Sequence, residues 1–209
     1  MTLTALISFI IYSFVTSVTP GPNNIMLISS GVSFGFKRTI PHILGIGFGF
    51  GLMVTLVGFG IGSILTNSKN LYEFVKIIGI VYLLYLAYQI YISDSVNTNN
   101  KPKSHKPLNF LQASLFQWVN PKAWVMTMGA VTAYTSSSSN ISIFLLIGLI
   151  YGAISIPSVG VWALVGDKLK ALINDRKKIR IFNISMALLL LISIISPLVE
   201  TLSFLREKI

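Results

Sequence analysis

Apolar positions follow one another along this chain in long uncharged stretches, which short polar or basic connectors separate. Residues 1–36, 39–68, 77–93, 107–121, 123–166 and 181–199 contain no Lys, Arg, Asp or Glu. A helix that crosses a bilayer needs about 20 mostly apolar residues, and most of these stretches approach or exceed that length. The pattern therefore predicts an all-α integral membrane protein.

Six transmembrane helices are expected, at about residues 3–31, 40–65, 74–92, 108–132, 141–165 and 181–202. The segment 93–107 (SDSVNTNNKPKSHKP) is polar and contains prolines, so we interpret it as a cytoplasmic linker. It divides a single transmembrane domain, residues 1–209, into a first three-helix repeat (1–92) and a second one (108–209). Three helices in each half give the second half the opposite direction, an inverted repeat that is typical of secondary transporters.

The composition supports a membrane protein and gives its expected orientation. Apolar residues make up 53% of the chain and charged residues only 11%, against about 25% charged in soluble domains. The net charge is +10, but the basic residues lie between the apolar stretches, which argues against nucleic-acid binding and for a positive-inside signal. With the N-terminus outside, eleven Lys and Arg fall on the cytoplasmic side and four on the outer side. Both termini are therefore predicted outside a bacterial plasma membrane, and the first segment is expected to be retained.

The first uncharged run is too long for one straight helix. As a single helix, residues 3–36 would measure about 50 Å against a hydrocarbon core of about 30 Å. Pro20 and Pro22 lack backbone N–H groups, and Gly21 between them is conformationally permissive. We expect the first helix to break here, with Asn23 and Asn24 directly after the break.

A second break is predicted at Asn120-Pro121-Lys122, near the start of the second half. Asn is a favoured N-cap residue and Pro a favoured first helical residue, so a new helical piece should begin at Pro121. The fourth predicted helix is thus broken like the first.

Two broken helices at matching places in two halves predict a binding site. Unpaired backbone groups at membrane depth are tolerated only where they face protein or a watery cavity. Two helix N-termini that face one cavity form a partly positive site, which suits a substrate carboxylate. The predicted substrate-binding residues are Pro20, Gly21, Pro22, Asn23, Asn24, Asn120, Pro121 and Lys122. The alternative is that the prolines only kink two packed helices.

Lys122 carries the one charge placed deep in an apolar stretch. A Lys near the middle of a membrane helix costs about 2.5–3.5 kcal/mol on insertion scales, which makes it a functional candidate. It is expected to pair with the substrate carboxylate or to change charge during transport. The alternative is a Lys whose long stem reaches the headgroups.

The second predicted helix is rich in glycine. Gly45/Gly49, Gly47/Gly51 and Gly58/Gly62 have GxxxG spacing, which predicts close helix packing and allows a homodimer. Nothing in the spacing matches a nucleotide-binding fingerprint.

The sequence offers little support for catalysis or for metal or cofactor binding. There is no cysteine, and neither a catalytic Ser-His-Asp grouping nor an HExxH motif occurs, so we expect no enzyme, cofactor or metal centre. His42 and His105 are predicted to be solvated and too far apart to form a pair. Tyr82 and Trp162 are candidates to line a pathway, although most aromatics here suit packing or the interface.

These motifs together resemble the LysE/RhtB family of amino-acid exporters. The resemblance covers nearly the whole chain and rests on the segments Thr19-Pro20-Gly21-Pro22-Asn23, Gly35-Phe36-Lys37-Arg38, Gly45-Ile46-Gly47, Gly79-Ile80-Val81-Tyr82-Leu83-Leu84-Tyr85-Leu86, Asn120-Pro121-Lys122-Ala123-Trp124 and Trp162-Ala163-Leu164-Val165-Gly166. The Pro-Gly-Pro-Asn-Asn form is similar to the cysteine/O-acetylserine exporter branch. The resemblance implies a six-helix exporter of small amino acids or derivatives, driven by exchange with protons.

Two other functions remain open from the residues alone. An exporter of another small solute or of a cation is one, although a cation site would call for carboxylate, His or Cys ligands within the membrane. A membrane assembly protein without transport activity is the other, although it would not need two matched helix breaks.

Overall fold

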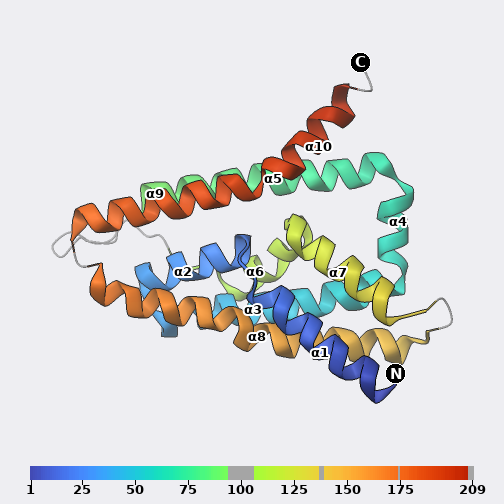
Figure 1. Ribbon diagram of the computed structural model, residues 1–209. Coiled ribbons are helices and arrows are strands. Elements are labelled where there is room, and N and C mark those ends of the chain that lie inside the picture. Colours follow the sequence, from blue (N-terminus) through green and yellow to red (C-terminus); the bar gives the residue numbers. More distant parts are fainter. Residues whose placement is uncertain (94–105, 137–138, 174, 207–209) are drawn as a thin grey trace.

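The computed structural model describes residues 1–93, 106–136, 139–173 and 175–206, and the regular structure in these ranges is helical throughout (Figure 1). The first half contains α1 (Leu3–Val18), α2 (Pro22–Phe34), α3 (Phe36–Leu56), the π-helical turn η1 (Val57–Ile61), α4 (Gly62–Asn67) and α5 (Lys69–Ile92). The second half contains α6 (Phe110–Phe116), the 3-10 turn η2 (Gln117–Val119), α7 (Pro121–Tyr134), α8 (Ile141–Leu172), α9 (Arg176–Ser193) and α10 (Ile195–Arg206). Most of the predicted linker, with His105, lies outside the described residues.

Helices of membrane-spanning length dominate this architecture. Four helical stretches of the described chain are long and apolar enough to cross a membrane: Phe36–Ile61, Lys69–Ile92, Ile141–Leu172 and Lys177–Arg206. The pair α1 and α2, bent by 57°, makes a fifth if it is counted as one span. Residues on the outside are strongly apolar, with Leu3, Val125 and Leu149 exposed by 72%, 73% and 72%. The protein is therefore an all-α membrane protein, as the sequence predicted.

Both predicted helix breaks are confirmed. Thr19 has extended backbone angles, α1 ends before it, and α2 begins at Pro22. Asn120 is likewise extended, and α7 begins at Pro121. The fourth predicted helix is thus divided into α6, η2 and α7, of 7, 3 and 14 residues, each shorter than the about 20 residues of a straight span.

Several predicted boundaries were wrong because charge ends a hydrocarbon span but not a helix. The helix expected at 40–65 begins at Phe36, the one expected at 74–92 begins at Lys69, and the one expected at 141–165 continues to Leu172. Lys and Arg are good helix formers, so these helices continue into the charged connectors. The last helix is also divided, since α9 ends at Ser193 and α10 begins at Ile195.

The helices form two groups (Figure 1). α3 packs along α8, and α2, α1 and α6 pack against this pair. α5 and α9 lie side by side as a separate layer, which α10 extends (Figure 1). The N-terminus and the end of α10 lie toward the same end of the molecule (Figure 1).

Glycines bring α3 and α8 into backbone contact, as the GxxxG spacing predicted. A Cβ atom on Gly51 would lie 2.7 Å from the carbonyl oxygen of Gly148, and one on Gly152 would lie 2.8 Å from that of Gly47. On another face of α3, the Ser114 hydroxyl donates to the Gly45 carbonyl at 2.9 Å. The glycines of α3 thus pack against α6 and α8 of the same chain.

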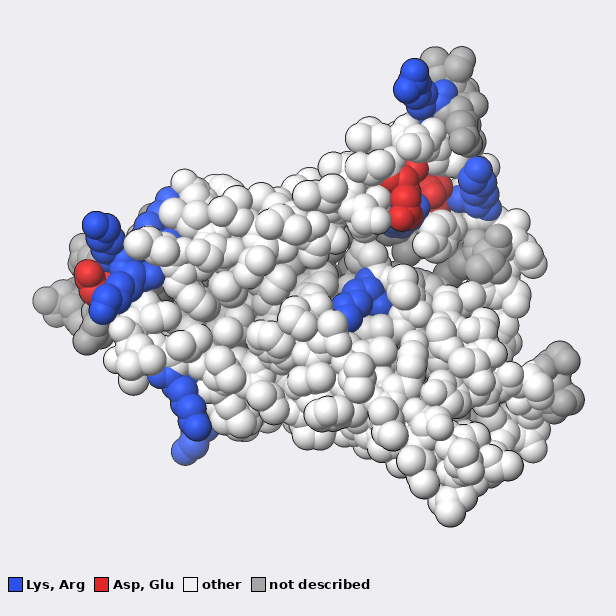
Figure 2. Space-filling view, in the orientation of Figure 1, with Lys and Arg blue, Asp and Glu red and all other residues white. Residues whose placement is uncertain are grey.

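Charged side chains are concentrated at the two ends of the molecule (Figure 2). Lys and Arg gather where α2 and α8 end and α9 begins, and we call this the basic end. It carries Lys37, Arg38, Lys168, Lys170, Lys177, Lys178 and Arg180. Near the opposite end, on α5 and α10, Figure 2 shows acidic and basic side chains together.

Candidate functional site

The break between α1 and α2 is held by Asn24. Its side-chain amide donates to the carbonyl oxygens of Ser17, Val18 and Thr19, at 3.1, 3.2 and 2.9 Å. These are carbonyls of the last turn of α1, which have no partner inside their own helix. Asn24 is only 2% exposed, so it satisfies this helix end where water has little access.

Lys122 connects the two breaks. From the first turn of α7, its ammonium group donates to the carbonyl of Thr19 and, at 3.3 Å, to that of Pro20. A cation at a helix C-terminus is favourable because it complements the negative end of the helix dipole. A Cβ atom on Gly21 would lie 2.5 Å from Cδ of Lys122, so the glycine leaves room for the lysine stem.

Asn23 and Gln117 form a second connection. The Asn23 amide donates to Oε1 of Gln117 at 2.9 Å, and the Gln117 amide donates back to Oδ1 of Asn23 at 3.3 Å. Gln117 is fully buried and also donates to the carbonyl of Ala113 at 2.9 Å. This paired amide bridge joins the start of α2 to the turn before α7.

The two helix N-termini at the breaks differ in their capping. Asn120 accepts a hydrogen bond from the backbone N–H of Lys122 at 3.1 Å and so caps α7. Gly21 offers α2 no side-chain cap. The N–H groups of the first turn of α2 therefore have no side-chain partner from the capping position, and they keep the partial positive charge of a helix start.

A small cavity lies where the two breaks meet, which we call the central cavity. Five of the eight predicted site residues line it: Gly21, Asn23, Asn24, Asn120 and Lys122. Its walls are completed by Thr16, Ser17, Ile46, Phe50, Ala123, Met126, Ser155 and Val159. The volume is about 20 Å³, which is room for about one water molecule.

The remaining predicted residues lie next to this cavity and shape the breaks. The Pro20 carbonyl accepts from Lys122, Pro22 is the first residue of α2, and Pro121 is the first residue of α7. No pattern in the sequence marked Ser17, Thr16 or Gln117, because polar residues within a helix look the same whether they face a cavity or a neighbouring helix. Thr16 contacts the hydroxyl of the fully buried Tyr151 at 2.5 Å.

A larger cavity of about 770 Å³ extends from the α2 side of the bundle to the basic end, and we call it the basic-end cavity. Tyr82 lines it, as proposed from the sequence, together with Ser29, Ser30 and His42. The prediction of a solvated His42 was wrong, since its exposure is 1%. α3 begins four residues earlier than expected, so His42 lies within the helix rather than at its end.

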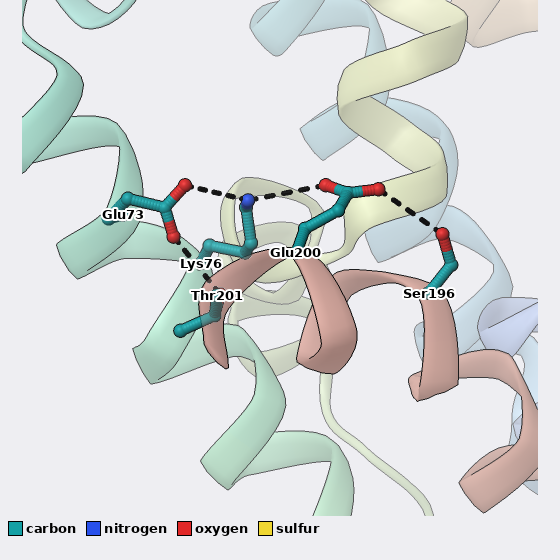
Figure 3. A network of polar contacts seen from close by, with 5 residues as sticks. All are labelled: Glu73, Lys76, Ser196, Glu200 and Thr201. Atoms are coloured by element: carbon teal, nitrogen blue, oxygen red, sulfur yellow. Dashed lines mark hydrogen bonds and ion pairs between the residues drawn. The ribbon is translucent and has the colours of Figure 1, made fainter. Parts of the chain in front are cut away.

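A third cavity, the outer pocket, lies on the other side of Lys122. It has a volume of about 270 Å³, and Lys122, Pro121, Lys76 and Glu200 are among its lining residues. Figure 3 shows Lys76 of α5 between the carboxylates of Glu73 and Glu200, at 2.8 and 3.3 Å. Lys122 thus borders both the central cavity and the outer pocket.

Two broken helices whose pieces start at a shared polar cavity, in an all-α membrane protein, are typical of membrane transporters. The chain belongs to the LysE family: the family model described as "LysE type translocator" matches residues 14–194. It is accordingly a multi-pass membrane transporter and not an enzyme.

Proteins similar to this chain have names that fit this family. The chain is 30% identical over 198 residues to a cysteine/O-acetylserine efflux protein of Salmonella choleraesuis, covering 91% of this chain and 95% of the relative. It is 31% identical over 193 residues to the protein of the same name from Escherichia coli K12, with the same coverage. No solved structure is significantly similar.

Proposed function

We propose that this protein exports small amino acids or their derivatives across the bacterial plasma membrane. The observation that carries the proposal is the central cavity, which both helix breaks border. A pair of proline kinks used only for packing would not need to bring Asn23, Asn120 and Lys122 to one polar space. The names of the relatives, cysteine/O-acetylserine efflux proteins, suggest small, uncharged side chains on the substrate.

The substrate carboxylate binds at the start of α2 in this proposal. The backbone N–H groups of Asn23 and Asn24 lack a side-chain cap, and Lys122 supplies a full positive charge close by. Ser17 adds a buried hydroxyl without a hydrogen-bond partner on the wall of the same cavity. The backbone N–H of Lys122 already donates to the Asn120 side chain. The start of α7 therefore binds the carboxylate through the Lys122 ammonium group more than through its backbone N–H groups.

Transport requires this site to open. A cavity of about 20 Å³ does not hold an amino acid, so the structure corresponds to a state in which the path is closed between the basic-end cavity and the outer pocket. The contacts that close it are the bonds of Lys122 to Thr19 and Pro20. A substrate carboxylate that attracts the ammonium group would replace these carbonyls and separate the two breaks.

For the topology we propose six membrane passes in two inverted repeats, residues 1–92 and 108–209, with both termini outside and the linker 93–107 in the cytoplasm. In this arrangement α3 corresponds to α8 and α5 to α9, and these are the helices that pack against each other. The basic end lies opposite the termini (Figures 1 and 2), in keeping with the positive-inside rule. Exchange with protons is proposed from the family resemblance. A homodimer remains a prediction, and the glycines on which it rested pack within the chain.

The experiment that tests the proposal is efflux of preloaded amino acids from cells that overproduce the protein. The medium is profiled for cysteine, O-acetylserine, threonine, homoserine, lysine and arginine, with and without a protonophore. Selective release that the protonophore abolishes supports proton-driven export and identifies the substrate. Absence of release of any of them, with the protein confirmed in the membrane, argues against amino-acid export.

A further inference from the structure

His42 is a buried imidazole that has no hydrogen-bond partner among the described residues. It lies in the second turn of α3, its exposure is 1%, and neither Nδ1 nor Nε2 has a hydrogen-bond partner. A buried polar group that makes no hydrogen bond costs about 1–3 kcal/mol, so a residue of this kind calls for a functional explanation. His42 is among the residues that line the basic-end cavity, but both ring nitrogens are covered. A solute in the cavity therefore reaches them after the imidazole turns toward it.

The described residues that line the rest of the basic-end cavity are largely polar, and Lys106 is the one Lys, Arg, Asp or Glu among them. The hydroxyl and amide groups of the cavity come from Ser29, Ser30, Ser33, Gln89, Ser93, Asn109 and Gln112, and its apolar wall includes Met26, Leu86 and Ile90. The titratable groups that line it beside His42 are Tyr82 and Tyr85 of α5 and Lys106 before α6. On α8, which packs along α3, Asp167 lies near Gly35 at the basic end, and α3 itself carries Lys37 and Arg38. In the part of the chain that the structure describes, none of the lining residues is a carboxylate.

Volume distinguishes the basic-end cavity from the central cavity. The central cavity holds about 20 Å³, whereas the basic-end cavity holds about 770 Å³, which is within the range of about 300–1,000 Å³ for pockets that bind whole small molecules. In this conformation a small solute fits on the basic side of the breaks but not between them.

We propose that the basic-end cavity is a loading site for a small zwitterionic amino acid, in which the His42 side chain binds the solute before it reaches the central cavity. This inference rests on the proposed function and adds a second site to it. A neutral imidazole has one N–H donor and one nitrogen acceptor, so it can donate to a carboxylate or accept from an ammonium group. Among the described residues that line the cavity there is no carboxylate to hold a metal cation, and their uncharged amides and hydroxyls suit a solute without net charge.

Kinetics of loading from the basic side test the role of His42. Uptake of radiolabelled O-acetyl-L-serine into everted membrane vesicles is measured for the wild type, His42→Ala and His42→Gln. Loss of a hydrogen bond to a charged solute group should raise KM about ten- to hundred-fold in His42→Ala, with a smaller change in maximal rate. His42→Gln retains a donor and an acceptor and should recover part of the affinity.

A matched control separates binding from packing. Thr127 of α7 is also fully buried, its hydroxyl likewise has no partner, and it is not among the residues that line the basic-end cavity. Thr127→Val should leave KM unchanged. A wild-type KM in His42→Ala, or an equal rise in Thr127→Val, overturns the loading site. If wild-type vesicles transport no amino acid at all, the proposed function fails instead.

The lack of cysteine in the chain provides a direct binding test. A single cysteine at Gln89, in the cavity, should react with a membrane-impermeant thiol reagent from the basic side, and O-acetyl-L-serine should slow that reaction. A cysteine at the exposed Lys177, at the same end but outside the cavity, should react without protection. Reaction at Gln89 that the solute does not slow contradicts the proposal, and this readout does not depend on transport.

Discussion

Asn23 and Gln117, which are 94 residues apart in sequence, bind each other through both halves of their side-chain amides. One residue belongs to the first turn of α2 and the other to the turn before α7. Each helix break therefore helps to position the other, and a substitution at one break should alter the conformation of both.

The first prediction concerns this amide pair. Asn23→Ala and Gln117→Ala should each lower stability by about 1–3 kcal/mol, because the first leaves the buried Gln117 amide, and the second the half-buried Asn23 amide, without this partner. The double variant should lose less than the sum of the two. Thermal unfolding of the purified protein in detergent measures all three. Strict additivity would show that the pair does not couple the breaks.

The second prediction concerns the ammonium group of Lys122. Lys122→Met keeps most of the stem but removes the charge, so export should fall by at least about tenfold while the amount of protein in the membrane stays normal. Lys168→Met removes an exposed charge at the basic end and should export like the wild type. Efflux and membrane immunoblots are measured together. Normal export by Lys122→Met would exclude this lysine from the transport site.

The third prediction concerns the glycine contact between α3 and α8. Gly51→Ala places a methyl group 2.7 Å from the Gly148 carbonyl, whereas the nearest atom to a methyl group on Gly160 is 3.9 Å away. Gly51→Ala should destabilise the protein by about 1–3 kcal/mol through overpacking. Gly160→Ala should be neutral or slightly stabilising, since Ala is the better helix former. Equal melting temperatures for the two variants would contradict the packing described.

The fourth prediction concerns the topology. A single cysteine at Thr2, the N-cap of α1, should react with an impermeant maleimide in intact cells. A single cysteine at Lys178, in the first turn of α9, should react only after the membrane is opened. The reverse pattern would place the basic end outside and contradict the orientation inferred from the charges.

The fifth prediction concerns the ion network between α5 and α10 (Figure 3). Glu73 is 7% exposed and binds both Lys76 and the Thr201 hydroxyl, whereas the side chain of Glu200 is 59% exposed. Glu73→Gln should therefore lower the melting temperature clearly, because it weakens a buried charged hydrogen-bond network. Glu200→Gln should change stability by less than about 1 kcal/mol. A larger effect of Glu200→Gln would reverse this ranking.

The fold class and the two helix breaks were predictable because they depend on local chemistry. Apolar length defines a spanning helix, and Pro20, Pro22 and Pro121 remove backbone donors wherever they occur. The helix ends were less predictable, because Lys69 and Arg176 are charged and still belong to helices. The division between α9 and α10 has a local cause of the same kind, which the prediction of helix ends did not use: Pro197 has no N–H to bond the carbonyl of Ser193, the last residue of α9.

The candidate site was predictable only in part. Asn23, Asn120 and Lys122 were found because they adjoin prolines, whereas Gln117 and His42 lie in ordinary helical sequence. Their roles depend on which helices pack against them, and this depends on contacts between residues far apart in the chain. Burial of His42 in particular follows from the packing of α3, which hydropathy along the chain does not report.

The backbone contact between α3 and α8 also limits how this molecule can move. Where Gly51 and Gly148 meet, there are no side chains that can change rotamer, so the two helices form one stiff unit. α5 and α9, by contrast, meet through flexible side chains such as Leu83 and Leu190, which can repack as the helices slide. The separation of the two breaks that opens the path should then occur while α3 and α8 stay fixed against each other, and the α5–α9 layer is the part that can repack around the moving breaks.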